Sequence, residues 1–128
     1  MAYGNNEHVT SGKATAAVSA FRFVKRGTAD DEIAESDANE VVVGIGPDYA
    51  LSAAEMGFYA SGGVSQVQCG GTVTRGDRLK ADADGKAVTI ASSGTTIQNV
   101  GGIALRSGVD GDVIPAQVEI YSERPALV

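Results

Sequence analysis

The chain has 128 residues, a formal net charge of −6 and a pI near 4.6, a length that suits one domain with its own core. Its ten Lys and Arg residues are scattered, with Arg22, Lys25 and Arg26 as the nearest approach to a patch. This distribution argues against direct nucleic-acid binding, which needs a concentrated basic face. The single cysteine, Cys69, excludes an internal disulfide and a cysteine-rich zinc site.

The apolar residues are mostly Val, Ala and Ile, glycine occurs 17 times, and aromatic residues make up only 5%. Small and β-branched side chains with many glycines are typical of short strands joined by tight turns. No apolar run reaches the about 18 residues of a membrane span, and no signal peptide is predicted. We therefore expect a soluble all-β protein, made and used in a cytoplasm, with at most one or two short helices.

The N-terminal segment is polar and lacks periodicity. Residues 1–13 predict an extended or disordered arm, and residues 14–20 fit either a brief helix or a closely packed strand. The chain is thus divided into an extended arm over residues 1–20 and a single β-rich domain over 21–128. Such an arm can order on binding by adding a strand to a neighbour's sheet edge, with Tyr3, His8 and Val9 as candidate contacts.

The next segments alternate between apolar and acidic. Phe21, Phe23 and their neighbours up to residue 25 predict a strand. Residues 27–40 carry six acids around Ile33 and predict a solvated loop or hairpin end that Ile33 pins down. Residues 41–45 form a continuous apolar run that predicts a strand covered on both faces.

Residues 50–56 are the best helix candidate, with Ser52 as a cap and Glu55 three residues later. Strands are then expected at Phe58-Tyr59 and at 64–69, around a Ser-Gly-Gly turn. Because aromatic residues are scarce here and favour contact surfaces, Phe58 and Tyr59 are candidates for an oligomer interface. Core packing is the alternative for both.

Two hairpins are predicted in the C-terminal half. One turns at the Asp-Gly step of residues 82–85, and the other joins strands at 103–105 and 113–121 through residues 109–112. Strand signals recur about every 8–12 residues, a spacing typical of a small β-barrel or β-sandwich.

The chain also contains a loose internal repeat. Residues 21–69 and 78–121 each open with an apolar-basic strand, enter an Asp- and Gly-rich turn and reach a Gly-Ile step. The steps are Gly44-Ile45 and Gly102-Ile103, so the offset is 58, because 102 minus 44 is 58. Two duplicated β-units that share no polar cluster indicate a scaffold rather than an active site.

No catalytic residue is predicted. The one histidine, His8, lies in the polar arm, where a catalytic base would be poorly preorganised. The Gly44-x-Gly46 step is followed at once by Pro47, so a dinucleotide-binding fingerprint fails. Cys69 is interpreted as a small core residue.

The sequence also does not match the motifs of metal-binding or cofactor-carrying sites. A calcium loop around Gly85 would place Lys80 and Ala91 at its first and last ligand positions, where carboxylates are required. An Asp-Gly hairpin turn accounts for the same residues. Lys86 lies near a hairpin tip, as the modified lysine of a carrier domain does, but its flanks do not match. We therefore expect no metal and no cofactor.

Two stretches of the sequence together resemble a known family. They are residues 73–88, VTRGDRLKADADGKAV, and residues 100–118, VGGIALRSGVDGDVIPAQV. Together with the strand and Gly-Ile step before them, these residues resemble the decoration (cement, or head-stabilising) proteins of tailed-bacteriophage capsids. The resemblance covers about residues 20–121, mostly turn and strand positions, so it specifies fold better than contacts. The long acidic loop at 27–40 and the polar arm depart from it.

The resemblance implies a catalytically inert virion protein that binds the major capsid protein on the outer capsid surface and stabilises the head. It also implies a homo-oligomer, with a trimer favoured, assembled in the host bacterial cytoplasm, with no direct nucleic-acid or membrane partner. A non-enzymatic adhesion or binding module of a phage tail or cell surface is the alternative.

Overall fold

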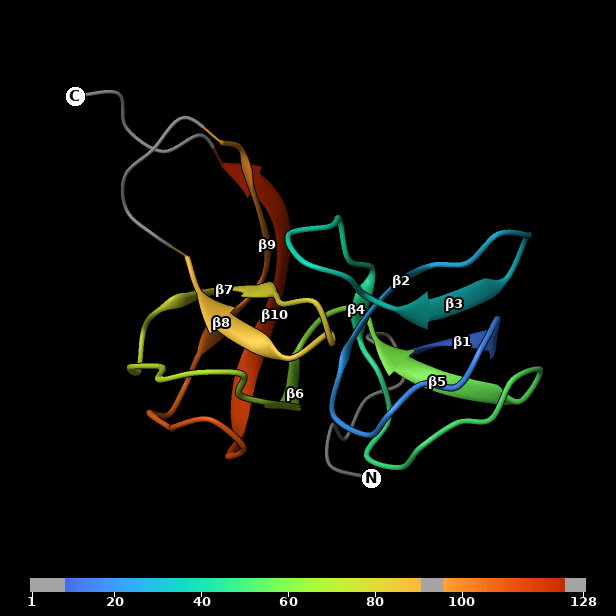
Figure 1. The fold of residues 1–128 in the computed structure, drawn as a ribbon, viewed down its shortest axis with the longest axis horizontal. Coiled ribbons are helices and arrows are strands. Elements are labelled where there is room, and N and C mark those ends of the chain that lie inside the picture. The colour runs from blue at the N-terminus through green and yellow to red at the C-terminus, as the bar shows by residue number, and fades with distance from the viewer. Residues whose placement is uncertain (1–8, 91–95, 124–128) are drawn as a thin grey trace.

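The computed structural model describes residues 9–90 and 96–123, and these residues form ten strands and no helix. The all-β class predicted from the sequence is confirmed, including its barrel. The strands divide into two groups of five, which lie side by side in Figure 1. In chain order the strands are β1 (Val9–Ala14), β2 (Phe23–Arg26), β3 (Glu32–Glu35), β4 (Gly44–Ile45), β5 (Met56–Ala60), β6 (Val64–Gln68), β7 (Arg78–Ala81), β8 (Ala87–Thr89), β9 (Gln98–Ala104) and β10 (Val113–Glu123).

The first five strands, residues 9–60, form a closed barrel that we call the barrel unit. Its order is β1-β3-β2-β4-β5, and β5 pairs back with β1. Closure depends on a parallel pairing of β1 with β3, in which Ala14 lies opposite Ile33. Both side chains are buried in a small core with Val18, Val24 and Leu51.

The last five strands, residues 64–123, form a sheet of order β6-β10-β9-β7-β8 that we call the open unit. If the barrel is cut between β1 and β3, its strands follow the same order. Where the barrel unit has its β1–β3 ladder, the described part of the open unit has one parallel bridge, from Cys69 to Ala87. The two units therefore share one topology and differ in closure.

The register of the two units also agrees. Ala14 opposite Ile33 corresponds to Cys69 opposite Ala87, and each is followed four residues later by an antiparallel bridge, from Val18 in one unit and Val73 in the other. The two Gly-Ile steps occupy matching positions, as the following pairs show: Phe23–Ile45 with Arg78–Ile103, Val24–Gly44 with Leu79–Gly102, and Ile45–Ala60 with Ile103–Gln117.

Close backbone approach explains the glycine of each Gly-Ile step. A Cβ on Gly44 would lie 2.0 Å from the carbonyl oxygen of Ala60, and one on Gly102 would lie 2.8 Å from that of Gln117. Ala60 and Gln117 are themselves matched positions. The step that repeats in the sequence thus marks the point where two backbones touch in each unit.

Residues of the barrel unit fill the seam of the open unit. Phe23 donates its backbone N–H to Gly85 O at 2.8 Å, and Gln68 donates its N–H to Phe21 O at 2.9 Å. The Phe23 ring is fully buried within the larger core cluster, and its edge lies 2.6 Å from where a Cβ on Gly101 would stand. The two units consequently share one core and form one body.

The predicted helix over residues 50–56 is wrong. Leu51 forms an antiparallel bridge with Val18, and β5 already begins at Met56. Of the two capping bonds, Ser52 N–H does donate to the Glu55 carboxylate, but Glu55 N–H donates to the Ser52 backbone carbonyl, as in a turn, and not to the Ser52 hydroxyl. Ala54, however, has a φ of 72°, which ends a turn instead of continuing a helix.

Other element bounds differ from the prediction because pairing overrides local composition. The acidic stretch at 27–40 contains β3, whose Ile33 is buried as expected. The strand expected over 41–45 shortens to β4, with Val42 buried but Val41 62% exposed.

The strands on either side of residues 61–63 do not pair with each other. β5 pairs with β1 and β4, whereas β6 pairs with β10. The predicted Ser-Gly-Gly hairpin is therefore a crossing from one unit to the other. The hairpins at 82–85 and at 109–112 are confirmed as β7–β8 and β9–β10.

The N-terminal strand belongs to the barrel. β1, which lies within the arm predicted over residues 1–20, pairs with both β3 and β5. Residues 1–8 lie outside the described residues. The two units run over 9–60 and 64–123, bounds that differ from the 21–69 and 78–121 predicted for the repeat.

Candidate interaction surface

Strand β5 presents an apolar strip on the outside of the barrel unit. Met56 and Phe58 alternate with buried Gly57, and their exposed fractions are 59% and 60%. Across the antiparallel ladder they lie opposite Lys13 and Ser11 of β1. Exposed aromatic and Met side chains on a rigid sheet are typical of protein contact surfaces.

The predicted contact residues separate in the structure. Tyr59 is half-buried and packs against the core of the barrel unit, while Phe58 faces solvent. Val9 is half-buried at the start of β1, opposite Ala60. Tyr3 and His8 lie outside the described residues. Of the predicted set, Phe58 is thus the side chain that the structure places on an open face.

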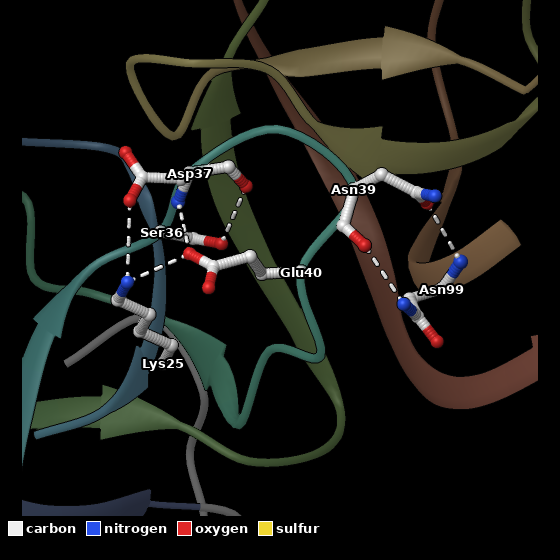
Figure 2. A network of polar contacts seen from close by, with 6 residues as sticks. All are labelled: Lys25, Ser36, Asp37, Asn39, Glu40 and Asn99. Atoms are coloured by element: carbon white, nitrogen blue, oxygen red, sulfur yellow. Dashed lines mark hydrogen bonds and ion pairs between the residues drawn. The ribbon is translucent and has the colours of Figure 1, made fainter.

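A polar network joins the loop after β3 to the open unit (Figure 2). Asn99 donates its backbone N–H to the Asn39 side-chain oxygen at 3.0 Å, and its side-chain amide donates to Asn39 O at 2.7 Å. Asn39 in turn donates to Ile97 O at 2.9 Å. Each of these bonds joins a side-chain amide on one segment to the backbone of the other, so together they hold the loop in register with β9.

The same loop carries an ion-pair cluster on its other side (Figure 2). The Lys25 ammonium lies 2.7 Å from a Glu40 oxygen and 3.3 Å from an Asp37 oxygen. The hydrogen bond that Lys25 donates to Glu40, opposed by partial desolvation and reinforced by Asp37, raises the pKa of Lys25. Glu40 also accepts the Asp37 N–H at 3.0 Å, so the cluster shapes the loop as well as neutralising Lys25.

A groove of about 620 Å³ runs between this loop and β10. Its walls are mainly aliphatic and come from both units. The residues that line it are Lys25, Arg26, Glu40, Val41, Val42, Val43, Ser61 and Ile120. Sequence reasoning missed it because Val41 and Ile120 are 79 positions apart and meet only through the pairing of the two units.

The described residues offer no sign of a reactive centre. Cys69 is fully buried, and burial together with nearby Asp112 and Asp110 raises the pKa of its thiol. Within residues 9–90 and 96–123, no group of three His, Cys, Asp or Glu side chains could hold a metal ion. The same residues contain no helix long and apolar enough to cross a membrane.

Comparison with known proteins places the fold. The chain matches no protein-family model and no curated protein sequence. Among solved structures it is similar to the head fiber gp8.5 N base of bacteriophage phi29, with a TM-score of 0.66 and 20% sequence identity. The match covers 87% of this chain and 92% of that one. At this identity the comparison shows a shared fold over nearly the whole length of both chains.

Proposed function

We propose that this chain is a structural virion protein that decorates the outer surface of a tailed-phage capsid. In this proposal it binds the major capsid protein and stabilises the head, and it is assembled in the host bacterial cytoplasm. The observation that carries the proposal is the fold shared over 92% of the base of a phage head fiber, a protein that is itself named for the phage head. The resemblance of residues 20–121 to decoration proteins supports the same role independently.

The exposed strip of β5 is the proposed contact face. Phe58 and Met56 stand on β5, which pairs along its whole length with β1 and at Ala60 with β4, so the backbone of the strip is already ordered before it binds. An aromatic anchor of this kind commonly dominates the energy of an interface. The acidic surface suits a protein that accumulates in many copies.

Co-sedimentation tests the proposal directly. The purified full chain is mixed with expanded capsid shells that lack it, and the bound fraction is measured against concentration. We expect saturable binding, and we expect Phe58→Glu to weaken it by about tenfold or more. Val109→Glu is the matched control, because Val109 is also exposed, at 56%, but lies in a turn of the open unit.

The binding experiment distinguishes failure of the decoration proposal from failure of the proposed contact face. If wild-type protein does not bind shells, decoration is wrong, and the alternative of an adhesion module of a phage tail or cell surface predicts binding to host cells instead. If wild-type protein binds and Phe58→Glu binds equally well, the proposed contact face is wrong.

The arm and the oligomer are tested separately. Deleting residues 2–8, with Tyr3 and His8, removes the segment before β1; a deletion that extends to residue 13 would also remove a barrel strand. Reduced binding to shells is expected if the segment contacts the capsid or an adjacent subunit. Light scattering after size-exclusion chromatography measures the oligomer, for which we propose a trimer.

A further inference from the structure

Residues 40–43, which we call the acceptor edge, have an open backbone edge. They lead into β4, which lies between β2 and β5. On the β2 side, Val43 donates its N–H to Val24 O at 2.8 Å. On the β5 side, β5 ends at Ala60 and the chain turns away into β6, so no strand among the described residues pairs with the acceptor edge.

The open unit shows the corresponding position filled. At the offset of 58 between the Gly-Ile steps, residues 40–42 correspond to Gln98–Val100 of β9. There Val100 lies opposite Tyr121 and Gln98 opposite Glu123, in an antiparallel ladder. The difference arises because β10 continues for 11 residues, whereas β5 stops after 5.

Apolar surface borders the unpaired side of the acceptor edge. The groove described above runs along the acceptor edge, with Val41 62% exposed on one wall and Ile120 of β10 41% exposed on the other. A strand laid against the acceptor edge would therefore satisfy backbone groups on one side and bury aliphatic side chains in the groove.

One cation at the groove would favour an acidic side chain on an incoming strand. Lys25 is already paired with two carboxylates, Glu40 and Asp37. Arg26 also lines the groove, is exposed, and forms no ion pair with any residue that the structure describes. An incoming segment with an acidic side chain near Arg26 would complement it.

We propose that the acceptor edge binds an extended, acidic segment of a partner protein as an added antiparallel strand, with an aliphatic or aromatic side chain in the groove. This interaction site is distinct from the β5 strip, and its test uses the isolated protein, so it stands or falls separately from capsid decoration. The partner supplies in the barrel unit what the end of β10 supplies in the open unit.

The probe is a peptide with the sequence of the end of β10, the strand that fills the corresponding position in the open unit. The blocked peptide Gln-Val-Glu-Ile-Tyr-Ser-Glu, residues 117–123, is titrated into the ¹⁵N-labelled full chain and followed by NMR. We expect saturable shifts confined to the amides of the acceptor edge and its neighbours in the groove. Val41→Lys should weaken binding at least about tenfold, because lysine on an edge discourages strand addition. Val109→Lys, the matched exposed control, should bind as wild type does.

Two further variants sharpen the assignment. The same peptide with Ile120→Pro should not bind, since proline removes a backbone donor and bends the strand. Arg26→Ala in the protein should weaken binding by about twofold to fivefold, the size expected for an exposed ion pair.

Three results would overturn the proposal. One is the absence of saturable shifts at millimolar peptide. Another is a set of shifts at Gln98–Val100, which would mean that the peptide exchanges with β10. The third is concentration-dependent self-association that Val41→Lys abolishes, which would assign the groove to a second copy of this chain.

Discussion

The barrel unit and the open unit have the same strand order and register but close in different ways. The barrel unit closes through its own β1–β3 ladder. Among the described residues, the seam of the open unit has only the bridge from Cys69 to Ala87, and Phe23 of the barrel unit fills it. Backbone pairing and the Gly-Ile step of each unit therefore maintain this topology, while the side chains that complete each core differ.

The largest expected effect comes from the residue that plugs the seam. Phe23→Ala should lower the free energy of unfolding by about 3–5 kcal/mol, because a fully buried aromatic ring is lost from the shared core. Its matched position in the open unit, Arg78, is part-exposed and pairs with Glu123. Arg78→Ala should cost below about 1 kcal/mol. Urea unfolding followed by circular dichroism measures both. Equal losses of unfolding free energy in the two variants would contradict the role of Phe23 in filling the seam.

The paired glycines rank next. Gly44→Ala should destabilise by about 3 kcal/mol and Gly102→Ala by about 1–2 kcal/mol, because the added methyl would overlap a carbonyl oxygen more severely at Gly44. The separations are 2.0 Å and 2.8 Å respectively. The same urea titrations give the ranking, and a larger loss for Gly102→Ala would show that the open unit is the tighter of the two.

The two units also differ in the residue that takes the left-handed backbone conformation at one matched turn. Ala54, with φ 72°, corresponds to Gly111, with φ 93°, at the offset of 57 that relates β5 to β10. Nothing lies within 4 Å of a Cβ on Gly111, so Gly111→Ala should cost about 1 kcal/mol from backbone strain alone. Ala54→Gly should gain at most about 0.5 kcal/mol, since glycine loses more entropy on folding. Thermal unfolding midpoints that move in the same direction for both variants would refute this.

The smallest effect concerns acid stability. Hydrogen bonds from Thr28, Ala29 N–H and Thr15 lower the pKa of Glu32 from its ordinary value of 4.5. A lowered folded-state pKa stabilises the fold above pH 4.5, and that contribution is lost as pH falls through the folded value. Glu32→Gln should therefore flatten the loss of stability below pH 4.5.

The matched position in the open unit is Lys86, at the offset of 54 that relates β3 to β8. Lys86→Gln should leave the acid limb of the stability curve unchanged. Unfolding free energies measured between pH 3 and pH 7 for both variants decide the matter; parallel acid limbs in Glu32→Gln and wild type would contradict the role of Glu32.

The sequence predicted those features that local chemistry determines. The Asp-Gly turn at residues 82–85 and the alternation after residue 113 identify both C-terminal hairpins, and composition identifies the all-β class. The helix prediction failed at Ala54 because an alanine there adopts the left-handed turn conformation that glycine takes at position 111. β3 was missed because Ile33 is the one large apolar residue in a charged stretch, and its strand character comes from pairing with β1 and β2.

Features of the candidate surfaces that depend on long-range pairing could not be predicted in this way. Scarcity of aromatics indicated Phe58, but only the ladder with β1 shows that it faces outward while Tyr59 faces the core. Asn39 and Asn99 are 60 positions apart, and nothing local in either segment indicates their contact.

Strand β10 has a mechanical consequence. It forms ladders with β6 over Val113–Gln117 and with β9 from Ala116 to Glu123, so tension applied along its axis would load two rows of hydrogen bonds in shear at once. Bonds loaded in shear must rupture together, whereas bonds that are peeled break one after another. A pull at Glu123 would thus be resisted by the ladders with both β6 and β9 and, through the Phe23 ring packed at Gly101 of β9, transmitted to the barrel unit.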